Sequence, residues 1–231
     1  MPIVQCSNVS KTYRQGQVVV QALKHINLTI DRGAFIALAG PSGSGKTTLL
    51  NLIGGLDQVD TGHIIVNGND YQQLSPSEMA DVRMHQIGFV FQSYNLIPVL
   101  SALENVEYVM LLQGVPTKER QTRARAILDE VGLAGKYDRR PNELSGGQQQ
   151  RVAVARAIVS GPAIVLADEP TANLDSKTGE RLLTIMRQMN TSHHVTFIFS
   201  THDAMVMEFA RRLVIIRDGE ITEDRSKPDK P

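Results

Sequence analysis

Short, uninterrupted apolar segments are the clearest feature of the chain's hydrophobic pattern. Each has the length of a strand and lacks the alternation of apolar and polar residues that marks a strand buried on one face only. Strands of this kind are typical of parallel sheets, because helices then cover both faces. The pattern therefore predicts a mostly parallel sheet built from residues 34–39, 87–91, 163–167 and 195–199.

Helical periodicity separates these strands. Residues 46–53 have helical character directly after the first strand, and residues 182–189 carry an apolar face between the last two strands. Between residues 95 and 160, apolar positions recur every three or four residues, as an amphipathic helix requires. This longer segment predicts a helical lobe inserted into an α/β core.

The two ends of the chain have a different pattern. Residues 3–9, 18–23 and 26–30 are short β-like pieces joined by turns, which predicts an antiparallel β layer at the N-terminus. Residues 223–231 are polar and contain proline, so we expect a loosely ordered tail. The whole chain is expected to form one domain: residues 1–94 and 161–222 make the α/β core with its β layer, and residues 95–160 make the lobe.

Composition narrows the possible partners. Lys+Arg and Asp+Glu both total 24, and a neutral chain lacks the basic surface that attracts nucleic acid. Cys6 is the only cysteine among the 231 residues, which excludes an internal disulfide and fits a reducing interior. A chain of this length supports one substantial core. Nucleic acid is therefore not an expected partner.

Hydropathy bears on the relation to a membrane. No apolar run approaches the roughly twenty residues that a membrane-spanning helix needs. Residues 1–5 show no basic segment followed by an apolar core, so no signal peptide is expected. We therefore expect any work at a membrane to be done through another chain.

A glycine-rich segment directly follows the first predicted parallel strand and matches the pattern G-x-x-x-x-G-K-[ST]. In such a loop, backbone N–H groups and a helix N-terminus attract phosphate, the lysine neutralises the β and γ phosphates, and the next hydroxyl ligates Mg²⁺. A chance glycine-rich turn would not need a strand before it and a helix after it. The sequence predicts a P-loop NTPase core whose phosphate site contains Gly40, Ser42, Gly43, Ser44, Gly45, Lys46, Thr47 and Thr48.

Two adjacent acids end the predicted strand 163–167. A carboxylate at the carboxyl end of a buried strand can reach the metal shell of a bound nucleotide, and Asp168 is assigned this role. Glu169 points differently and is placed to orient the attacking water or to accept its proton. A helix-start or loop acid is the alternative for Glu169, and the neighbouring phosphate site disfavours it.

Residues 144–151, Leu-Ser-Gly-Gly-Gln-Gln-Gln-Arg, resemble the signature of the ATP-binding cassette (ABC) ATPases. Ser145 can cap the helix that follows, and Gly146 and Gly147 leave its first amides open to an anion. Gln148 completes the motif. An ordinary capped helix is the alternative, but it leaves the other motifs of the family, all present in order, unexplained.

The resemblance covers residues 3–222 and implies roles for four further residues. Tyr13 matches the aromatic residue that stacks on adenine, although a tyrosine in a β layer also serves packing. Gln92 matches the glutamine that links Mg²⁺ and attacking water to the membrane partner. Asp175 matches the acid that crosses the dimer interface, and it can also cap the following helix. His202 matches the histidine that contacts the γ phosphate.

Taken together, the resemblance implies ATP and Mg²⁺ as cofactors, with Thr47, Gln92 and Asp168 on the metal side and Glu169, His202, Lys46 and Gln92 in catalysis. It also implies a head-to-tail dimer, because in this family the signature of one subunit covers the nucleotide of the other. Residues 49–57 and 91–106 resemble the branch that serves lipoprotein release and macrolide-type export. The expected place is the cytoplasmic face of the inner membrane, on separate transmembrane permease subunits.

Several alternatives remain open from the sequence. A motor for export or lipoprotein extraction competes with a division-type dimer that transmits force across the membrane without transport. A soluble cassette protein of translation or repair is disfavoured by the single-cassette length and neutral charge. Residues 96–100 could receive a coupling helix of a permease or pack inside the lobe. For His193-His194, a solvated turn is preferred over a metal site.

Overall fold

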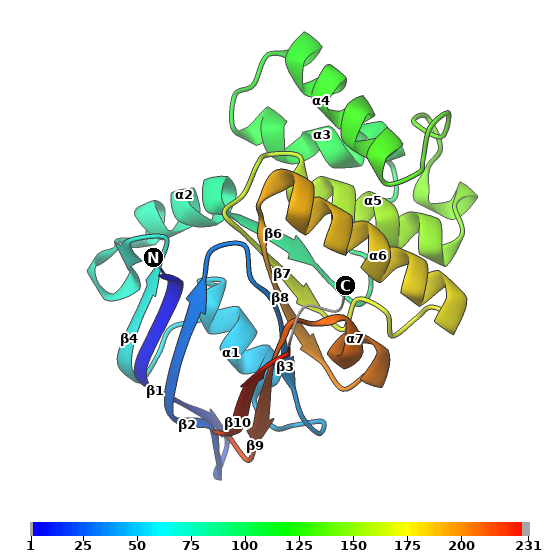
Figure 1. Cartoon of the computed structure of the whole chain (residues 1–231). Helices are drawn as coiled ribbons and strands as arrows, with labels where there is room; N and C mark the ends of the chain where they lie inside the picture. The colour runs from blue at the N-terminus through cyan, green and yellow to red at the C-terminus, as the bar shows by residue number, and fades with distance from the viewer. Residues whose placement is uncertain (1, 228–231) are drawn as a thin grey trace.

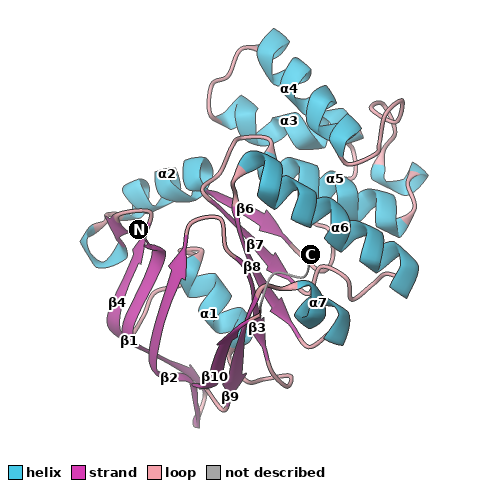
Figure 2. Cartoon of the chain, viewed as in Figure 1, coloured by secondary structure: helices cyan, strands magenta, loops and turns pink. Residues whose placement is uncertain are grey.

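The computed structural model describes residues 2–227, which form two sheets with helices between and around them (Figures 1 and 2). The larger sheet has the strand order β10-β9-β3-β8-β7-β6, and the smaller has the order β2-β1-β4-β5. The strands are β1 (Pro2–Gln15), β2 (Val18–Asp31), β3 (Phe35–Ala39), β4 (Thr61–Val66), β5 (Asn69–Asp70), β6 (Ile87–Val90), β7 (Ile164–Asp168), β8 (Thr196–Thr201), β9 (Arg212–Arg217) and β10 (Glu220–Ser226).

The larger sheet confirms the predicted parallel core. Strands β6, β7, β8, β3 and β9 pair in parallel, and only β10 runs antiparallel, beside β9. All residues of β3 and β8 are buried, as continuous apolar runs require when both faces are covered. Because parallel strands end at the same edge, the loops after β3, β6, β7 and β8 meet there.

The helices follow the predicted segments. Helix α1 begins and ends at the predicted residues, and residues 95–160 contain α3, α4 and α5. The helices are α1 (Lys46–Ile53), α2 (Pro76–Gln86), α3 (Ala102–Leu112), α4 (Thr117–Glu130), α5 (Gly146–Ile158), α6 (Ser176–His193) and α7 (Ala204–Phe209), with two 3₁₀ turns, η1 (Tyr71–Gln73) and η2 (Pro141–Glu143).

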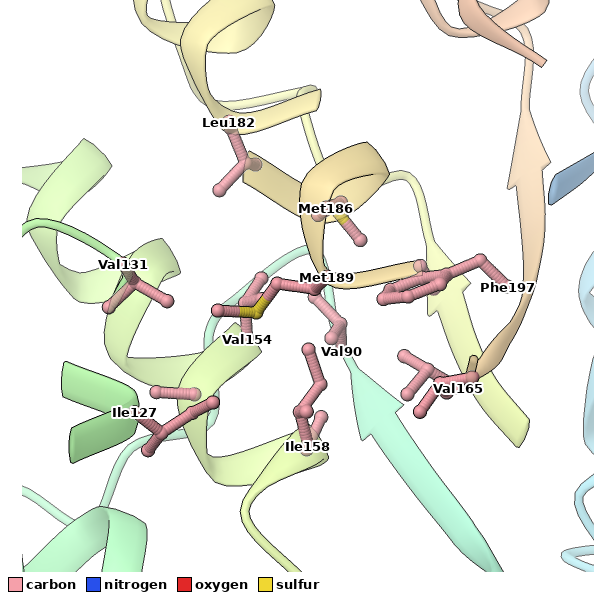
Figure 3. Packing of buried hydrophobic residues seen from close by; sticks show 14 of the residues in the cluster. Val90, Ile127, Val131, Val154, Ile158, Val165, Leu182, Met186, Met189 and Phe197 are labelled. Carbon is pink, nitrogen blue, oxygen red and sulfur yellow. The ribbon is translucent and has the colours of Figure 1, made fainter. Parts of the chain in front are cut away.

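The core has two layers, one on each face of the larger sheet. Successive residues of one strand serve different layers: Phe35 and Ala37 pack with α3, α4, α5 and α6, whereas Ile36 packs with α1 and the β layer. Figure 3 shows the first layer, in which Val154 of α5 and Met186 of α6 lie with Phe197 of β8. The helical segment thus shares its core with the sheet.

The N-terminal layer is antiparallel, as predicted, but its division into short pieces is wrong. Residues 3–9 belong to one strand of 14 residues, β1, and residues 18–23 and 26–30 belong to a second, β2. Register shifts, including one between Cys6 and Val9, absorb the irregular hydrophobic pattern without ending the strand. Helix α1 lies between this layer and the larger sheet (Figure 1).

The prediction of a loose tail from residue 223 is wrong for its first part. Glu223 to Ser226 continue β10, whose backbone pairs with β9, and Arg212 of β9 donates to both carboxylate oxygens of Asp224 at 2.8 and 2.7 Å. A polar segment forms this strand because nearly all of its side chains face solvent at the sheet edge. Residues 228–231 of the expected tail lie outside the described residues. Within residues 2–227, no helix has the length and apolar character of a membrane span.

Candidate active site

The phosphate loop, residues 40–47, joins β3 to α1 at the carboxyl edge of the larger sheet. Lys46 is only 6% exposed, and its Nζ donates to the carbonyl oxygens of Gly40 and Pro41, both at 2.8 Å. A Cβ at Gly40 would lie 2.1 Å from the carbonyl oxygen of Ile216, so only glycine permits this close approach to β9. The loop is therefore tightly curled around its own lysine.

Two features of the loop suit an anionic ligand. Helix α1 starts after Gly45 without a side-chain cap, which leaves its first N–H groups free of a local acceptor. The hydroxyl oxygen of Ser44 is buried and has no hydrogen-bond partner within residues 2–227. A cavity of about 340 Å³ adjoins the loop, lined by Gly43, Lys46, Thr47 and Thr48 from the loop side and by Val20 to Ala22 of β2.

The charge of Lys46 is balanced by the two predicted acids. Burial lowers the pKa of Lys46, and the carboxylates of Glu169 and Asp168 partly offset this effect. A phosphate placed at the loop would favour the charged ammonium further, because an adjacent negative charge stabilises it. The electrostatics therefore fit a polyanion.

Thr47 and Asp168 meet, as the prediction of a shared metal shell requires. The Thr47 hydroxyl donates to Asp168 Oδ1 at 3.1 Å, which places a hydroxyl and a carboxylate side by side. Oxygen donors of this kind suit Mg²⁺. Gln92 follows β6, the neighbour of β7, so it lies at the same sheet edge; its side chain is exposed and its backbone oxygen accepts a hydrogen bond from Asn173 at 2.9 Å.

Glu169 is held by the last two residues of β8 and by the residue that follows it. Its backbone has a positive φ of 46°, a conformation that costs a non-glycine residue free energy and is retained where the surroundings demand it. The backbone N–H donates to the Ser200 oxygen at 2.9 Å, the Thr201 hydroxyl donates to Oε2 at 3.3 Å, and His202 Nδ1 lies 2.6 Å from Oε1. The Glu169 side chain is 14% exposed and the His202 side chain 68% exposed. Glu169 is thus far more constrained than a loop acid.

The signature segment, residues 144–151, forms the capped start of α5. The Ser145 oxygen accepts from the Gln148 N–H at 3.4 Å, and the Gln148 side chain accepts from the Ser145 N–H at 3.0 Å. A Cβ at Gly147 would lie 2.4 Å from the methyl group of Thr178 in α6. Ser145 and Gly147 line a cavity of about 660 Å³ that shares no residue with the cavity at the phosphate loop. One chain therefore does not bring its two phosphate-seeking helix starts together at one cavity.

The remaining predicted residues lie at the margins of the site. Tyr13 of β1 is 40% exposed and pairs in register with Val20, which lines the phosphate-side cavity. Asp175 is the N-cap of α6, where its carboxylate accepts from the Thr178 N–H at 3.1 Å, so the capping alternative is confirmed.

The prediction of a solvated turn at His193-His194 is right about exposure, since both residues are exposed, but wrong about the turn at its first residue. His193 is the last residue of α6, and its Nε2 lies 2.8 Å from the carboxylate of Glu130 in α4. His194 adopts a positive φ of 54° as the C-cap. No group of three or more metal-ligating residues is found within residues 2–227.

Sequence reasoning missed several supporting residues. Thr201 donates a hydrogen bond to Glu169. The side chain of Gln150, in the signature segment, is fully buried and donates to the Pro170 carbonyl oxygen at 2.8 Å. Asp57 accepts a hydrogen bond from Tyr13. Only proximity in the fold reveals these contacts, since Asp57 lies 44 positions from Tyr13 and Gln150 lies 20 positions from Pro170.

Comparison with known proteins agrees with this geometry. Residues 23–172 match the family model described as ABC transporter. An uncharacterized ABC transporter ATP-binding protein of Thermotoga maritima is 45% identical over 219 residues, which cover 95% of this chain and 93% of that protein. The macrolide export ATP-binding/permease protein MacB of Sodalis glossinidius is 45% identical over the whole chain, but the chain spans only about a third (35%) of its length.

Solved structures give the same result. The ATP-binding cassette MJ0796, in a dimeric post-hydrolysis state bound to ADP and Pi, has a TM-score of 0.89 and 42% identity, covering 98% of this chain and 100% of that one. The corresponding protein of Methanocaldococcus jannaschii is an uncharacterized ABC transporter ATP-binding protein. Family model, full-length relatives and fold all agree. The chain therefore belongs to the ABC transporter family, as one of its ATPase domains.

Proposed function

We propose that the chain binds and hydrolyses ATP as the motor of a membrane transporter. The observation that carries this proposal is the arrangement at the carboxyl edge of the larger sheet, where Lys46 and Thr47 of the phosphate loop lie beside Asp168 and Glu169. A phosphate cradle, a metal-side acid and a second, constrained acid are the parts that phosphoryl transfer to water needs. The resemblance of the chain to a cassette bound to ADP and Pi supports the same reaction.

The phosphate loop is proposed to hold the ATP phosphates. Lys46 would exchange its two backbone acceptors for the β and γ phosphates, and the free amides at the start of α1 would donate to the same groups. Thr47, Asp168 and Gln92 would hold Mg²⁺, which when bound supplies positive charge to the transferred phosphoryl group. Ser42, Ser44, Thr48 and the loop glycines complete the cradle.

Glu169 is proposed as the catalytic carboxylate. Its hydrogen bond from Thr201 and its contact with His202 fix the side chain in one orientation, so that it can orient a water molecule and take its proton. His202, which is exposed on its other side, is proposed to contact the γ phosphate. The side chain of Glu169 thus works on the water, and Lys46 works on the phosphate.

The signature segment is proposed to act on the nucleotide of a second copy. Ser145, Gly146, Gly147 and Gln148 would cover the γ phosphate held by the partner's phosphate loop, with Asp175 at the interface between the copies. The separation of the two cavities in one chain supports this arrangement, and the solved MJ0796 cassettes are dimeric. ATP would then join two chains head to tail, and hydrolysis would release them.

Separate transmembrane permease subunits are the proposed partners, at the cytoplasmic face of the inner membrane. The loop at residues 96–100 supports both uses considered for it: Leu96 packs against the core, whereas Val99 is 72% exposed. The side-chain amide of Asn105 in α3 accepts from the Ile97 N–H at 2.8 Å and donates to the Ile97 carbonyl oxygen at 3.1 Å. These two hydrogen bonds fix the loop in which Val99 is exposed. Val99 is therefore available to a coupling helix of a permease.

Three experiments test the proposal. Purified chain should hydrolyse ATP only when Mg²⁺ is present, and absence of any Mg²⁺-dependent hydrolysis in chain that binds ATP would contradict the motor role. Capture from native membranes, with Val99→Asp as the control that should lose the partner, should retain a transmembrane chain. If reconstituted complexes hydrolyse ATP without moving lipoprotein, lipid, drug or peptide, force transmission without transport becomes the preferred role.

A further inference from the structure

The ring of Tyr13 is anchored by residues outside the recognised nucleotide motifs. Its hydroxyl donates to Asp57 Oδ2 at 2.7 Å. Asp57 lies in the loop that follows α1, so the contact joins the N-terminal β layer to the loop behind the phosphate-binding helix. Lys11 Nζ lies 5.2 Å from the centre of the same ring, within the range of a cation–π interaction.

Lys11 fixes the anchor as well as the ring. It is 9% exposed, and its Nζ donates to Asp57 Oδ1 at 2.8 Å and to the Gln58 carbonyl oxygen at 2.6 Å. The two oxygens of Asp57 are thus divided between Lys11 and Tyr13. The Lys11 side chain is 11% exposed and that of Asp57 30% exposed, so this charge-assisted contact is partly shielded from solvent, and it leaves the carboxylate few alternative positions.

The protonation states support the same hydrogen bond. Burial and the hydrogen bond to Asp57 raise the pKa of Tyr13, so the phenol remains a donor at neutral pH. Burial acts to raise the pKa of Asp57, but hydrogen bonds from Lys11, Tyr13 and the Gln58 backbone outweigh it and lower the pKa. The phenol donates and the carboxylate accepts throughout the physiological range.

Fixing the Tyr13 ring matters because this part of the chain is exposed to solvent. From Tyr13 and its partner Val20 outward, the β1–β2 arm runs into solvent, and Val18, Val19 and Val20 are all more than half exposed. An aromatic side chain on an exposed arm would lose rotational freedom when it bound a planar ligand, which weakens binding. Tyr13 instead lies opposite Val20, at the wall of the phosphate-side cavity, with its orientation already set.

We propose that Asp57, supported by Lys11, is a positioning residue for adenine: it holds the Tyr13 ring in the orientation that receives the base of ATP. The inference rests on the proposed function, because it requires the chain to bind ATP, and on the stacking role that the family resemblance implies for Tyr13. Asp57 belongs neither to the phosphate loop nor to the signature segment, and it is distinct from the two acids Asp168 and Glu169. The inference gives it a role in placing the ring that receives the base. Its effect is specific to the base and leaves phosphate binding unchanged.

The test compares ATP with inorganic tripolyphosphate, which has the phosphate chain but no base. Binding of both, with Mg²⁺, is measured by isothermal titration calorimetry. Asp57→Ala and Tyr13→Phe each remove one side of the same hydrogen bond, so each should weaken ATP binding roughly three- to tenfold and leave tripolyphosphate binding unchanged. The double variant should bind ATP no more weakly than the weaker single variant, because both remove one interaction. Asp57→Asn, which keeps an acceptor, should recover part of the affinity.

Gln58→Ala is the matched control, since its side chain is exposed and only its backbone contacts Lys11; ATP binding should not change. Unchanged ATP affinity in Asp57→Ala and Tyr13→Phe, with a weakened Tyr13→Ala, would overturn the role of Asp57 but keep that of Tyr13. Equal weakening of ATP and tripolyphosphate in Asp57→Ala would also overturn it, as a general loop disturbance. If Tyr13→Ala itself bound ATP normally, the stacking role that the family resemblance implies for Tyr13 would fail instead.

Discussion

Two helices of this chain start at sites suited to phosphate, and they start in different ways. Helix α1 begins after Gly45 with no side-chain cap, and the buried Lys46 lies over the loop. Helix α5 begins with a complete capping box, in which Ser145 and Gln148 satisfy each other's backbone N–H groups. The first backbone N–H groups of α1 need a ligand as acceptor, whereas some of those at the N-terminus of α5 already have an acceptor within the chain.

This difference indicates that the N-termini of α1 and α5 have different roles. The phosphate loop is arranged to bind an anion within a single chain. Under the proposed function, the signature segment would exchange internal hydrogen bonds for contacts with a nucleotide that a second chain brings to it, so we expect it to contribute less within one chain. We therefore expect variants at α1 to fail in binding, and variants at α5 to fail in dimer formation and turnover.

The largest effect is expected from Lys46→Ala. It removes the buried ammonium from the phosphate loop, so ATP affinity should fall sharply and turnover should be abolished. Equilibrium binding and a steady-state hydrolysis assay measure the two quantities. Normal turnover in this variant would refute the assignment of the phosphate site.

Glu169→Gln separates chemistry from binding. The amide keeps the size of the side chain but loses the carboxylate that takes the proton, so the hydrolysis rate should fall about 10²- to 10⁴-fold. The phosphate loop and signature segment stay intact, so ATP should hold two chains together. Size-exclusion chromatography with light scattering should detect this dimer with ATP and not with ADP. Hydrolysis at the wild-type rate would reduce Glu169 to a loop acid.

Mixing two inactive variants tests whether the signature segment of one chain acts on the nucleotide held by the phosphate loop of another. Chains with Lys46→Ala and chains with Ser145→Arg should each be inactive alone, although Ser145→Arg should still bind ATP as a monomer. A mixed dimer retains at most one intact composite site, so activity should reappear at a fraction of the wild-type level. Full activity of Ser145→Arg alone would mean that each chain hydrolyses ATP without a partner.

The smallest effect is expected from Gly147→Ala. The added methyl would collide with the methyl group of Thr178, so the Thr178 side chain must rotate or one of the two helices must shift, at a cost of about 1–3 kcal/mol in the free energy of unfolding. ATP-dependent dimer formation should weaken while ATP binding by the monomer does not. The second substitution Thr178→Ser removes the colliding methyl and should restore both quantities, as measured by thermal unfolding and light scattering. No recovery would show that Gly147 has another role.

Local pattern alone determined much of this protein. The apolar runs fixed the parallel strands because burial on both faces leaves a continuous run, and the motif at residues 40–47 fixed the start of α1 because strand, loop and helix are contiguous there. The capping role of Asp175 was likewise predictable, since an N-cap involves residues only three positions apart.

Only the tertiary structure decided the contacts between distant segments. Polar residues continue β1, β2 and β10 because backbone pairing and solvent-facing positions stabilise them, which no local periodicity reveals. The contact of Glu169 with His202 depends on β7 and β8 being adjacent, and that of Tyr13 with Asp57 depends on the β layer lying against the loop after α1. Hydrogen bonds across such separations follow from the packing of whole elements, so the sequence supplies the residues and the fold supplies their partners.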